Sequence, residues 1–250
     1  AAYVHSGGTT GSPKLVKLTH RGFSYKFWAN THVMAHTADD VIFADYPMFH
    51  IAGFFGKGIM AIADGMEIVI PSPNGARDKS FIENYWKFVE KYRITILSGV
   101  PTTLAQLCKR PPNGEDLSSL RPYGVTGSTA FPPEIARQLQ QICGVRMFST
   151  YGATEYTQNV AQTPRDGDFR LGSAGLRLPY TQIKIVELDD AGRIERECAA
   201  DEIGLVVVKG PSVTPGYVDG AYDQGILLPD GWFNSGDLGR IDPDGFLWIT

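Results

Sequence analysis

The sequence has few cysteines, no long apolar run and no block of like charge, and each absence excludes a class of protein. Cys108, Cys143 and Cys198 are an odd number with no C-x-x-C pair, so free thiols in a reducing compartment are expected. No apolar run approaches the ~18 residues of a membrane-spanning helix. The first residues also lack the charged region of a signal peptide. These absences predict a cytoplasmic protein.

Charge is spread along the whole chain. The 23 lysines and arginines and the 27 aspartates and glutamates give a formal net charge of −4, with no cluster of either sign. This distribution argues against a nucleic-acid partner and against a polybasic membrane patch. The length of 250 residues and the hydrophobic content of 43% are typical of a globular protein with one large domain, or one domain and a smaller one.

Glycine and hydroxyl side chains are concentrated near the beginning of the chain. Residues 6–14, reading S-G-G-T-T-G-S-P-K, hold three glycines, four hydroxyls and one lysine. Glycines let several backbone N–H groups point into one concavity, and hydroxyls and an ammonium can complete a cage for an anion. The pattern predicts a polyphosphate-binding loop that contains Ser6, Gly7, Gly8, Thr9, Thr10, Gly11 and Lys14.

This loop differs from the Walker loop of P-loop NTPases. Ser12 and Pro13 separate Gly11 from Lys14, and Leu15 follows the lysine where a Walker loop has serine or threonine. Alternating residues on both sides of the loop predict two strands, with a helix only after the second strand. A hairpin turn without a ligand is the alternative interpretation, because glycine and serine clusters mark turns generally.

Strand and helix patterns alternate over the following residues. Strands are expected at 41–44, 67–70, 95–98, 123–126 and 145–149. One helix is expected to open with a capping box at Ser80–Glu83, and the helix after Thr19 is expected to bury Phe23, Phe27, Ala29 and Val33. Repeated βα units predict an α/β fold with a doubly wound, mainly parallel sheet over residues 1–172. Short strands dominate afterwards and predict a small β-barrel-like subdomain at 173–250.

Two segments resemble signatures of the adenylate-forming (AMP-binding) superfamily, which includes acyl-CoA and aryl-CoA ligases, peptide-synthetase adenylation domains and beetle luciferases. The loop at 6–14 is similar to the family's nucleotide-binding signature, and Y-G-A-T-E at 151–155 is similar to its Y-G-x-T-E motif. The resemblance implies that the loop holds the β- and γ-phosphates of ATP. It implies four motif roles and four catalytic residues. In the motif, Tyr151 stacks on adenine, Gly152 lets the backbone approach the nucleotide, Thr154 binds the α-phosphate and Glu155 ligates Mg²⁺. The implied catalytic residues are Thr10, Lys14, Thr154 and Glu155.

Three further segments resemble the family with more departures. P-M-F-H-I-A-G at 47–53 is similar to a motif beside the carboxylate pocket. T-G-S-T-A-F at 126–131 departs from the family's G-G-x-P-L turn, and the segment at 231–238 has serine in place of threonine. The resemblance implies that the substrate meets His50, Gly53, Gly127 and Gly152, that adenine meets Gly127 and Ser128, and that Asp237 accepts the ribose hydroxyls. Without the family, His50 reads as a core histidine and Asp237 as part of a turn.

The implied function is ATP-dependent activation of a fatty or aryl acid to an acyl-adenylate with release of pyrophosphate, followed by transfer to coenzyme A. Amino-acid-activating members pair the substrate's ammonium with an aspartate. Residues 49–53 carry no carboxylate, so an acid without an α-amine is expected. ATP, Mg²⁺ and coenzyme A are the implied cofactors. The alternatives are an adenylation domain that loads a carrier protein, a luciferase-type oxygenase and a nucleotide-binding fragment without turnover.

Family members extend beyond both ends of the region that this sequence resembles. An α/β portion precedes the phosphate loop, and a small domain with a lysine that contacts the substrate carboxylate follows a segment similar to residues 245–250. The resemblance therefore implies a fragment that lacks both portions and is poorly active by itself.

Overall fold

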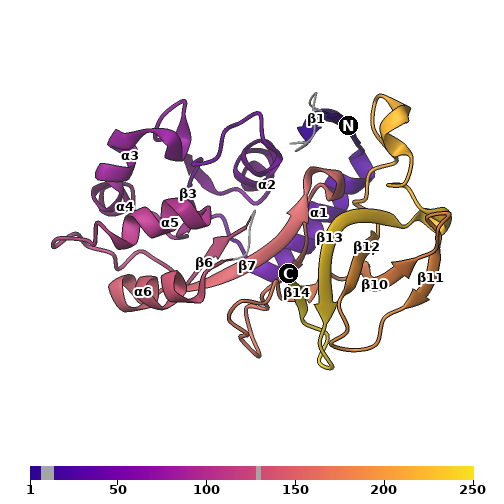
Figure 1. The fold of residues 1–250 in the computed structure, drawn as a ribbon. Helices are drawn as coiled ribbons and strands as arrows, with labels where there is room; N and C mark the ends of the chain where they lie inside the picture. The colour runs from indigo at the N-terminus through magenta and orange to yellow at the C-terminus, as the bar shows by residue number, and fades with distance from the viewer. Residues whose placement is uncertain (7–13, 128–130) are drawn as a thin grey trace.

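The computed structural model describes residues 1–6, 14–127 and 131–250. Helices and short parallel strands occupy one part of the molecule, and an antiparallel sheet occupies the other, as Figure 1 shows. No helix in the described ranges is long and apolar enough to cross a membrane.

Short parallel strands form the centre of the α/β part. Their bounds are β3 Val41–Phe43, β4 Glu67–Val69, β5 Ser98–Gly99, β6 Tyr123–Thr126 and β7 Arg146–Ala153. Strands β3 and β4 pair in parallel, and β6 pairs in parallel with both β5 and β7. Four of the five predicted strands are present near their predicted positions, whereas the third, predicted at 95–98, forms only at Ser98–Gly99. The carboxyl ends of β5, β6 and β7 therefore lie at one edge.

The sheet becomes mixed beyond the predicted end of β7 at residue 149. The strand continues to Ala153, and its second half pairs antiparallel with β8 (Gln158–Gln162). Strand β8 also pairs antiparallel with β9 (Leu176–Arg177). The chain reverses direction in a single turn, η3 (Thr154–Tyr156), and so returns beside itself. Residues 151–153 thus belong to the strand, beyond its predicted end at residue 149.

Helices cover both faces of the parallel strands, as a doubly wound sheet requires. Their bounds are α1 His20–Met34, η1 Ala52–Ile59 (a π-helix), α2 Met60–Ala63, α3 Lys79–Glu83, α4 Tyr85–Tyr92, α5 Pro101–Cys108 and α6 Pro133–Cys143. Helices α3 to α6 share one apolar core with Phe43 and Met147 of the strands. On the opposite face, Met34 of α1 packs with Tyr123 and Phe148.

The beginnings of two helices test the predicted caps. The hydroxyl of Thr19 accepts the backbone N–H of Gly22, so α1 begins where predicted. The capping box at Ser80 is wrong, because Asp78 caps α3 and its carboxylate accepts the N–H of Ser80. A carboxylate placed just before the first turn satisfies the free N–H groups, which puts Ser80 inside the helix.

The buried face of α1 differs from the predicted stripe. Phe27 and Val33 are only half-buried. The buried side chains and glycine are Gly22, Phe23, Lys26, Ala29, Asn30 and Met34. Two of these residues are polar, so the helix presents a lysine and an asparagine where apolar packing was expected.

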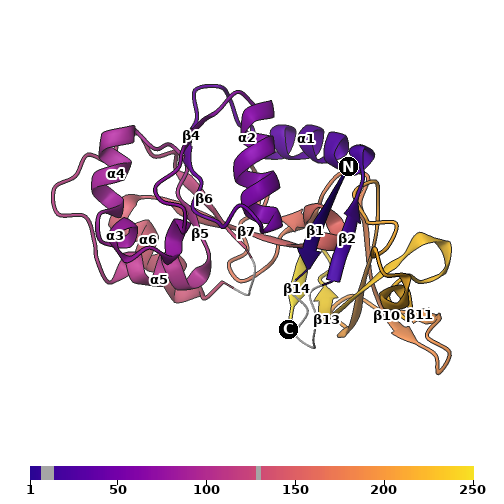
Figure 2. The ribbon, with the colours of Figure 1, turned by 90° about the horizontal axis from the view of Figure 1, so that it is seen from above.

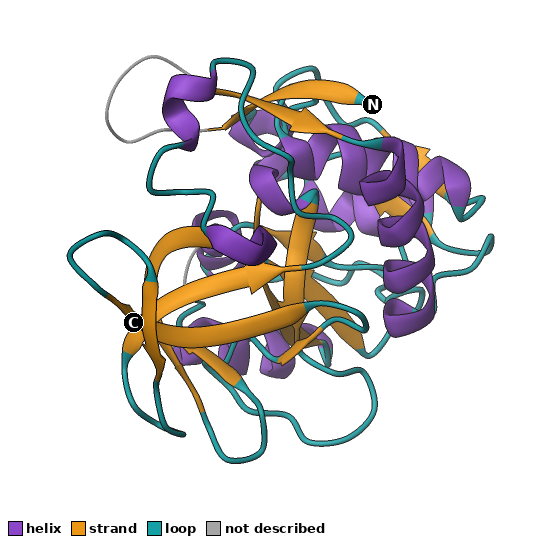
Figure 3. Cartoon of the chain, turned by 90° about the vertical axis from the view of Figure 1, so that its right-hand side faces the viewer, coloured by secondary structure: helices purple, strands orange, loops and turns teal. Residues whose placement is uncertain are grey.

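The second part of the molecule is an antiparallel sheet, drawn among the orange strands near the C-terminus in Figure 3. It has five strands in the order β11-β10-β12-β13-β14. Its strands are β10 Gln182–Leu188, β11 Ile194–Glu197, β12 Gly204–Lys209, β13 Phe233–Ile241 and β14 Leu247–Ile249. Val206 and Phe233 of this sheet share a core with Tyr156 and Val160 beside and within β8. The shared core joins the sheet to the α/β part, and the division at residue 172 stays a prediction.

A hairpin made of β1 (Ala2–Ser6) and β2 (Lys14–Leu18) flanks the predicted phosphate loop (Figure 2). Ser6 lies opposite Lys14 in its register. The strand pair agrees with the prediction for both sides of the loop. Val16 forms a bridge with Tyr217, and the N–H of Lys17 donates to the carbonyl of Gly216 at 3.1 Å. The hairpin is thereby attached to the segment that precedes β13.

Candidate active site

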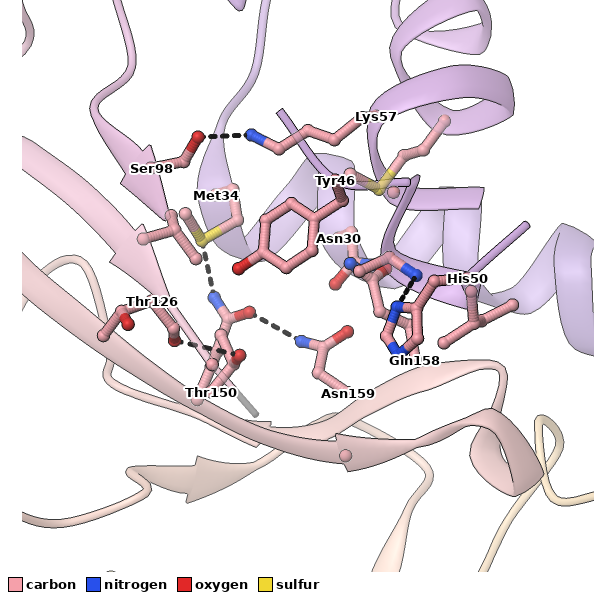
Figure 4. A pocket seen from close by; sticks show the side chains of 18 of the residues that line it. Asn30, Met34, Tyr46, His50, Lys57, Ser98, Thr126, Thr150, Gln158 and Asn159 are labelled. Atoms are coloured by element: carbon pink, nitrogen blue, oxygen red, sulfur yellow. Dashed lines mark hydrogen bonds between the residues drawn. The ribbon is translucent and has the colours of Figure 1, made fainter. Parts of the chain in front are cut away.

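A cavity of about 350 Å³ lies between α1 and η1 on one side and strands β5 to β8 on the other (Figure 4). Its volume falls within the ~300–1,000 Å³ typical of small-molecule sites. Thr126 and Thr150 line it from the carboxyl ends of the parallel segments of β6 and β7. Ligands of open α/β sheets bind at this edge, so the cavity has the position of a ligand site.

The structure brings six of the predicted site residues to this cavity from four distant parts of the sequence. They are Ser6, His50, Gly127, Gly152, Thr154 and Glu155. We call Ser6, Thr154 and Glu155 the motif wall. Thr154 is buried, and its hydroxyl donates to the carbonyl of His5 at 3.4 Å. This bond ties the Y-G-A-T-E segment to the strand that leads into the predicted phosphate loop.

Glu155 is buried and held from two sides. Its Oε1 accepts the hydroxyl of Tyr217 at 2.9 Å, and its backbone carbonyl accepts the N–H of Thr214 at 2.7 Å. Burial, and then the negative charge of Glu155, raise the pKa of Tyr217. The phenol therefore stays protonated and donates to the carboxylate. Sequence reasoning gave Tyr217 no role, because nothing local to it points to a partner 62 residues away.

Lys14 lies beside the same tyrosine. Its Nζ is 5.3 Å from the ring centroid of Tyr217 and 5.1 Å from that of Tyr222. Both distances are within the range of a cation–π contact. Lys14 and Glu155 thus meet the same phenol ring, one at its face and the other at its hydroxyl.

Tyr151 and Asp237, predicted to hold the nucleoside, meet across the two parts of the molecule. The hydroxyl of Tyr151 in β7 donates to Oδ2 of Asp237 in β13 at 2.6 Å. Burial, and then Asp237, raise the pKa of Tyr151, so the phenol remains the donor. Neither residue lines the cavity itself, but Tyr151 directly precedes Gly152, which does.

The predicted glycines are placed where a side chain has no room. A Cβ on Gly152 would stand 1.9 Å from the carbonyl of Gln158, where β7 meets β8. A Cβ on Gly127 would stand 2.5 Å from the hydroxyl of Thr150. Gly53 is buried against the backbone of Pro47, at 2.2 Å by the same measure, and does not line the cavity. Its predicted contact with substrate stays a prediction.

Several predicted residues fall on segments that the structure does not describe. Among them are the residues of the predicted phosphate loop and of the adenine turn, namely Gly7, Gly8, Thr9, Thr10, Gly11 and Ser128. Their predicted roles are carried only by the resemblance.

Side-chain amides from α1 on one side and β8 on the other also line the cavity, which the sequence analysis missed. We call Asn30 of α1 and Gln158, Asn159 and Gln162 of β8 the amide wall. Asn159 donates through Nδ2 to Oε1 of Gln162 at 2.8 Å, and Gln162 Nε2 lies 2.8 Å from the sulfur of Met34. A polar residue on the otherwise apolar face of a helix was the available signal for Asn30.

Lys57 of η1 also reaches the cavity, and it is already paired. Its Nζ donates to the hydroxyl of Ser98 at 2.6 Å (Figure 4). It also lies 3.7 Å from a carboxylate oxygen of Asp45. Asp45 is buried, so the ion pair is largely removed from water. The pairing leaves little net charge at this end of the cavity.

His50 stands at the start of η1, where the cavity adjoins a second one of about 620 Å³. Desolvation, and then the charge of Arg77, lower the pKa of His50. The N–H of Ala52 lies 3.1 Å from Nδ1. A neutral ring that accepts this bond carries its proton on Nε2. Tyr46 and His50 line both cavities, so they form the partition between them.

Comparison with known proteins decides the family. A family model described as AMP-binding enzyme matches residues 1–218. The chain belongs to the AMP-binding enzyme family. The predicted family is thereby confirmed. Curated relatives and solved structures show how much of this AMP-binding chain they match.

Two curated relatives match the AMP-binding chain over its whole length. A marinolic acid–CoA ligase of Pseudoalteromonas sp. is 34% identical over 100% of the chain and 39% of that protein. A long-chain-fatty-acid–CoA ligase of Bacillus subtilis is 29% identical over 100% of the chain and 43% of that protein. The chain therefore spans less than half the length of these relatives.

Two solved structures match the AMP-binding chain in fold. ATP-bound MatB from Rhodopseudomonas palustris is 27% identical with a TM-score of 0.87, over 99% of this chain and 47% of that one. The O-succinylbenzoate coenzyme A synthetase of Bacillus subtilis, in complex with ATP and magnesium, is 26% identical with a TM-score of 0.84, over 99% and 49%. The likeness confirms the predicted α/β fold class.

Proposed function

We propose that this chain contains the adenylate-forming centre of an acid–CoA ligase. A fatty or aryl acid would react with ATP to give an acyl-adenylate and pyrophosphate, and coenzyme A would then take the acyl group. The observation that carries the proposal is the placement of Ser6, Thr154 and Glu155 on one cavity at the carboxyl edge of β6 and β7. The CoA ligases among the relatives support it.

The first step is an in-line displacement that needs positioning more than covalent help. A carboxylate oxygen of the acid attacks the α-phosphorus of ATP, and the bond from that phosphorus to the bridging oxygen of pyrophosphate breaks. In our proposal the hydroxyl of Thr154 contacts the α-phosphate, and Lys14 and the loop at 6–14 hold the β- and γ-phosphates. In the second step the sulfur of coenzyme A attacks the acyl carbon, and AMP leaves.

Glu155 fits the proposed role of magnesium ligand. Magnesium prefers carboxylate oxygens and phosphates, and Glu155 offers a buried carboxylate that also lines the cavity. Tyr217 occupies one oxygen of this carboxylate, which fixes its orientation. When bound, the ion would neutralise part of the phosphate charge.

Tyr151 and Asp237 fit the proposed nucleoside contacts. Their hydrogen bond at 2.6 Å holds the aspartate beside the strand that carries Gly152. We propose that Asp237 accepts the ribose hydroxyls and that the ring of Tyr151 meets adenine. The nucleoside would then lie where residues 1–172, the proposed nucleotide- and acyl-binding subdomain, meet the proposed second subdomain at 173–250.

The charges around the cavity support an acid without an α-amine. Among the described lining residues, Glu155 is the one carboxylate, and it is bonded to Tyr217. A substrate ammonium would need a counter-charge of its own when buried. The expectation drawn from residues 49–53 therefore agrees with the lining of the whole cavity.

The experiment is acid-dependent exchange of labelled pyrophosphate into ATP, measured on the full-length protein and on Glu155→Gln. This substitution removes the negative charge but keeps the shape of the side chain and an oxygen that can accept the hydroxyl of Tyr217. We expect exchange to fall about 100-fold, the order seen when one charge-stabilising group is removed from an active site.

Glu195→Gln is the same substitution at an exposed position on β11, and it should leave the rate of pyrophosphate exchange unchanged. Wild-type exchange that needs no added acid would contradict the ligase proposal. Equal exchange by Glu155→Gln and wild type would remove Glu155 from the mechanism.

A further inference from the structure

The cavity contains polar atoms that are buried and have no hydrogen-bond partner in the described part of the chain. Asn30 and Asn159 are both less than 5% exposed, and Thr126 is 1% exposed. The unpartnered atoms that line the cavity include Asn30 Nδ2, Thr126 Oγ1, Gln158 Oε1 and Asn159 Oδ1. Leaving such atoms unpaired in a protein interior is unfavourable. A bound molecule that pairs them removes this disadvantage.

The backbone around Gln158 is held in an unfavourable conformation to place these groups. Thr157 and Gln158 both have positive φ values, 55° and 92°, which residues with a side chain rarely adopt. They directly follow η3 (Thr154–Tyr156), where the chain turns back as β8 along the cavity. The Gln158 amide then lies over Gly56 of the π-helix η1, where a Cβ would stand 2.5 Å from Nε2. Strained backbone and π-helical turns are both frequent at functional sites.

The charge near these atoms is balanced. Lys57 is the one lysine or arginine among the described lining residues, and Asp45 and Ser98 already pair it. A second carboxylate on the substrate would find no unpaired cation here. Amides and a hydroxyl instead suit a neutral group, because they can donate to or accept from an oxygen.

Resting on the proposed function, we propose that the amide wall and Thr126 select acids whose tail carries a neutral oxygen substituent, such as a hydroxyl or a ketone. Figure 4 shows the labelled side chains of Asn30, Thr126 and Asn159 around one space, with Tyr46 between them. An unsubstituted alkyl tail would leave their polar atoms unpaired. A site built to bond an oxygen discriminates strongly against the analogue that lacks it.

The test measures pyrophosphate exchange by the full-length protein with acids of equal chain length. They are an unsubstituted alkanoic acid, the set of acids that carry one hydroxyl at successive positions along the same chain, and the dicarboxylic acid. We expect the best hydroxy acid to exceed the unsubstituted acid at least tenfold in kcat/KM. The diacid should be no better than the unsubstituted acid.

Two variants assign the preference to these residues. Asn30→Leu, which breaks no hydrogen bond within the described ranges, and Thr126→Val, which keeps the shape, should each lower the ratio of hydroxy to unsubstituted acid about tenfold. Asn113→Leu, at an exposed loop, should leave the ratio unchanged. The ratio is measured on one enzyme preparation, so partial unfolding cancels.

Each result has one meaning. Equal rates for hydroxy and unsubstituted acids, or a preference for the diacid, would overturn this inference and leave the ligase proposal standing. A ratio that neither variant changes would also overturn it. Absence of exchange with every acid would overturn the ligase proposal, and this inference with it.

Discussion

The two walls of the cavity differ in how many of their buried polar atoms are paired within the described residues. On the motif wall, Thr154 is bonded to the backbone of His5, and Glu155 is bonded to Tyr217. On the amide wall, Asn30 Nδ2 and Asn159 Oδ1 have no partner among the described residues. Polar atoms with a hydrogen-bond partner are held in a fixed geometry, whereas polar atoms without one are available to bond a ligand.

This difference matches what each wall would bind under our proposals. Phosphoryl chemistry is the same for every acid, so its contacts gain from side chains locked in place before substrate arrives. The tail of the acid differs between ligases, and its recognition requires atoms that the protein itself leaves unpaired. The paired groups of the motif wall would thus act in the reaction, and the unpaired atoms of the amide wall would act in the selection of the substrate.

Lys26 provides the largest test of this comparison, because its ammonium has no hydrogen-bond partner among the described residues and does not line the cavity. Its Nζ lies 5.6 Å from the ring centroid of Tyr25. It is fully buried, and burial lowers its pKa to about 7. A cation–π contact is worth only about 1–2 kcal/mol, less than the cost of burying a charge, so this lysine should destabilise the fold. We expect Lys26→Met to raise the free energy of unfolding at pH 7 by about 3 kcal/mol.

The sign of the pH dependence follows from the lowered pKa. Between about pH 7 and the usual lysine pKa of 10.5, the unfolded chain binds more protons at this position than the folded one. Stability contributed by Lys26 therefore rises with pH across this window, and Lys26→Met should remove that rise. Thermal unfolding at pH 7 and pH 9 measures it, with the exposed Lys109→Met as control. A variant less stable than wild type at pH 7 would show that Lys26 has a stabilising partner.

Breaking the fixed contact on the motif wall should have a smaller effect, expressed in activity. Tyr217→Phe removes the hydroxyl that orients Glu155 and keeps the ring beside Lys14. Loss of one hydrogen bond to a charged group should lower kcat/KM for ATP in the exchange reaction about tenfold.

The matched control is Tyr222→Phe. Its ring also faces Lys14, and its hydroxyl makes no hydrogen bond within the residues that the structure covers. This variant should keep the wild-type rate. Equal losses in both variants would mean that the rings matter and the bond to Glu155 does not.

The smallest expected effect is on the stability of the open wall without ligand. Asn30→Leu replaces an unpartnered amide with an apolar side chain of similar size, so we expect it to raise the free energy of unfolding by about 1 kcal/mol. Thermal unfolding of the ligand-free full-length protein measures this. A fall of similar size would show that Asn30 has a structural partner and would weaken the contrast between the walls.

Local patterns predicted most of the fold. Apolar runs located the parallel strands, and Thr19 marked the start of α1. Two expectations failed for different reasons. Strand β7 runs past residue 149 because β8 returns to pair with it, and a short-range pattern cannot show that pairing. Asp78 displaced Ser80 as a cap because two competing acceptors stand within three residues.

The candidate site was predictable where a segment resembles a family motif. Thr154 and Glu155 were found in this way, and the cavity includes both. Asn30 and Tyr217 were missed for two different reasons. Asn30 occupies a helix face that was read as core, and Tyr217 acts through a bond to a residue of another segment. A polar residue on a helix face that is otherwise predicted to be buried is the local signal for a residue such as Asn30.

The most direct test of the account is a crystal structure of the full-length protein with a non-hydrolysable hydroxyacyl-adenylate analogue. We predict the ribose at Asp237, the phosphate mimic at Thr154, and the acyl tail in the cavity with its hydroxyl bonded to the amide wall. An analogue bound with its tail outside this cavity, or with its ribose away from Asp237, would contradict the account.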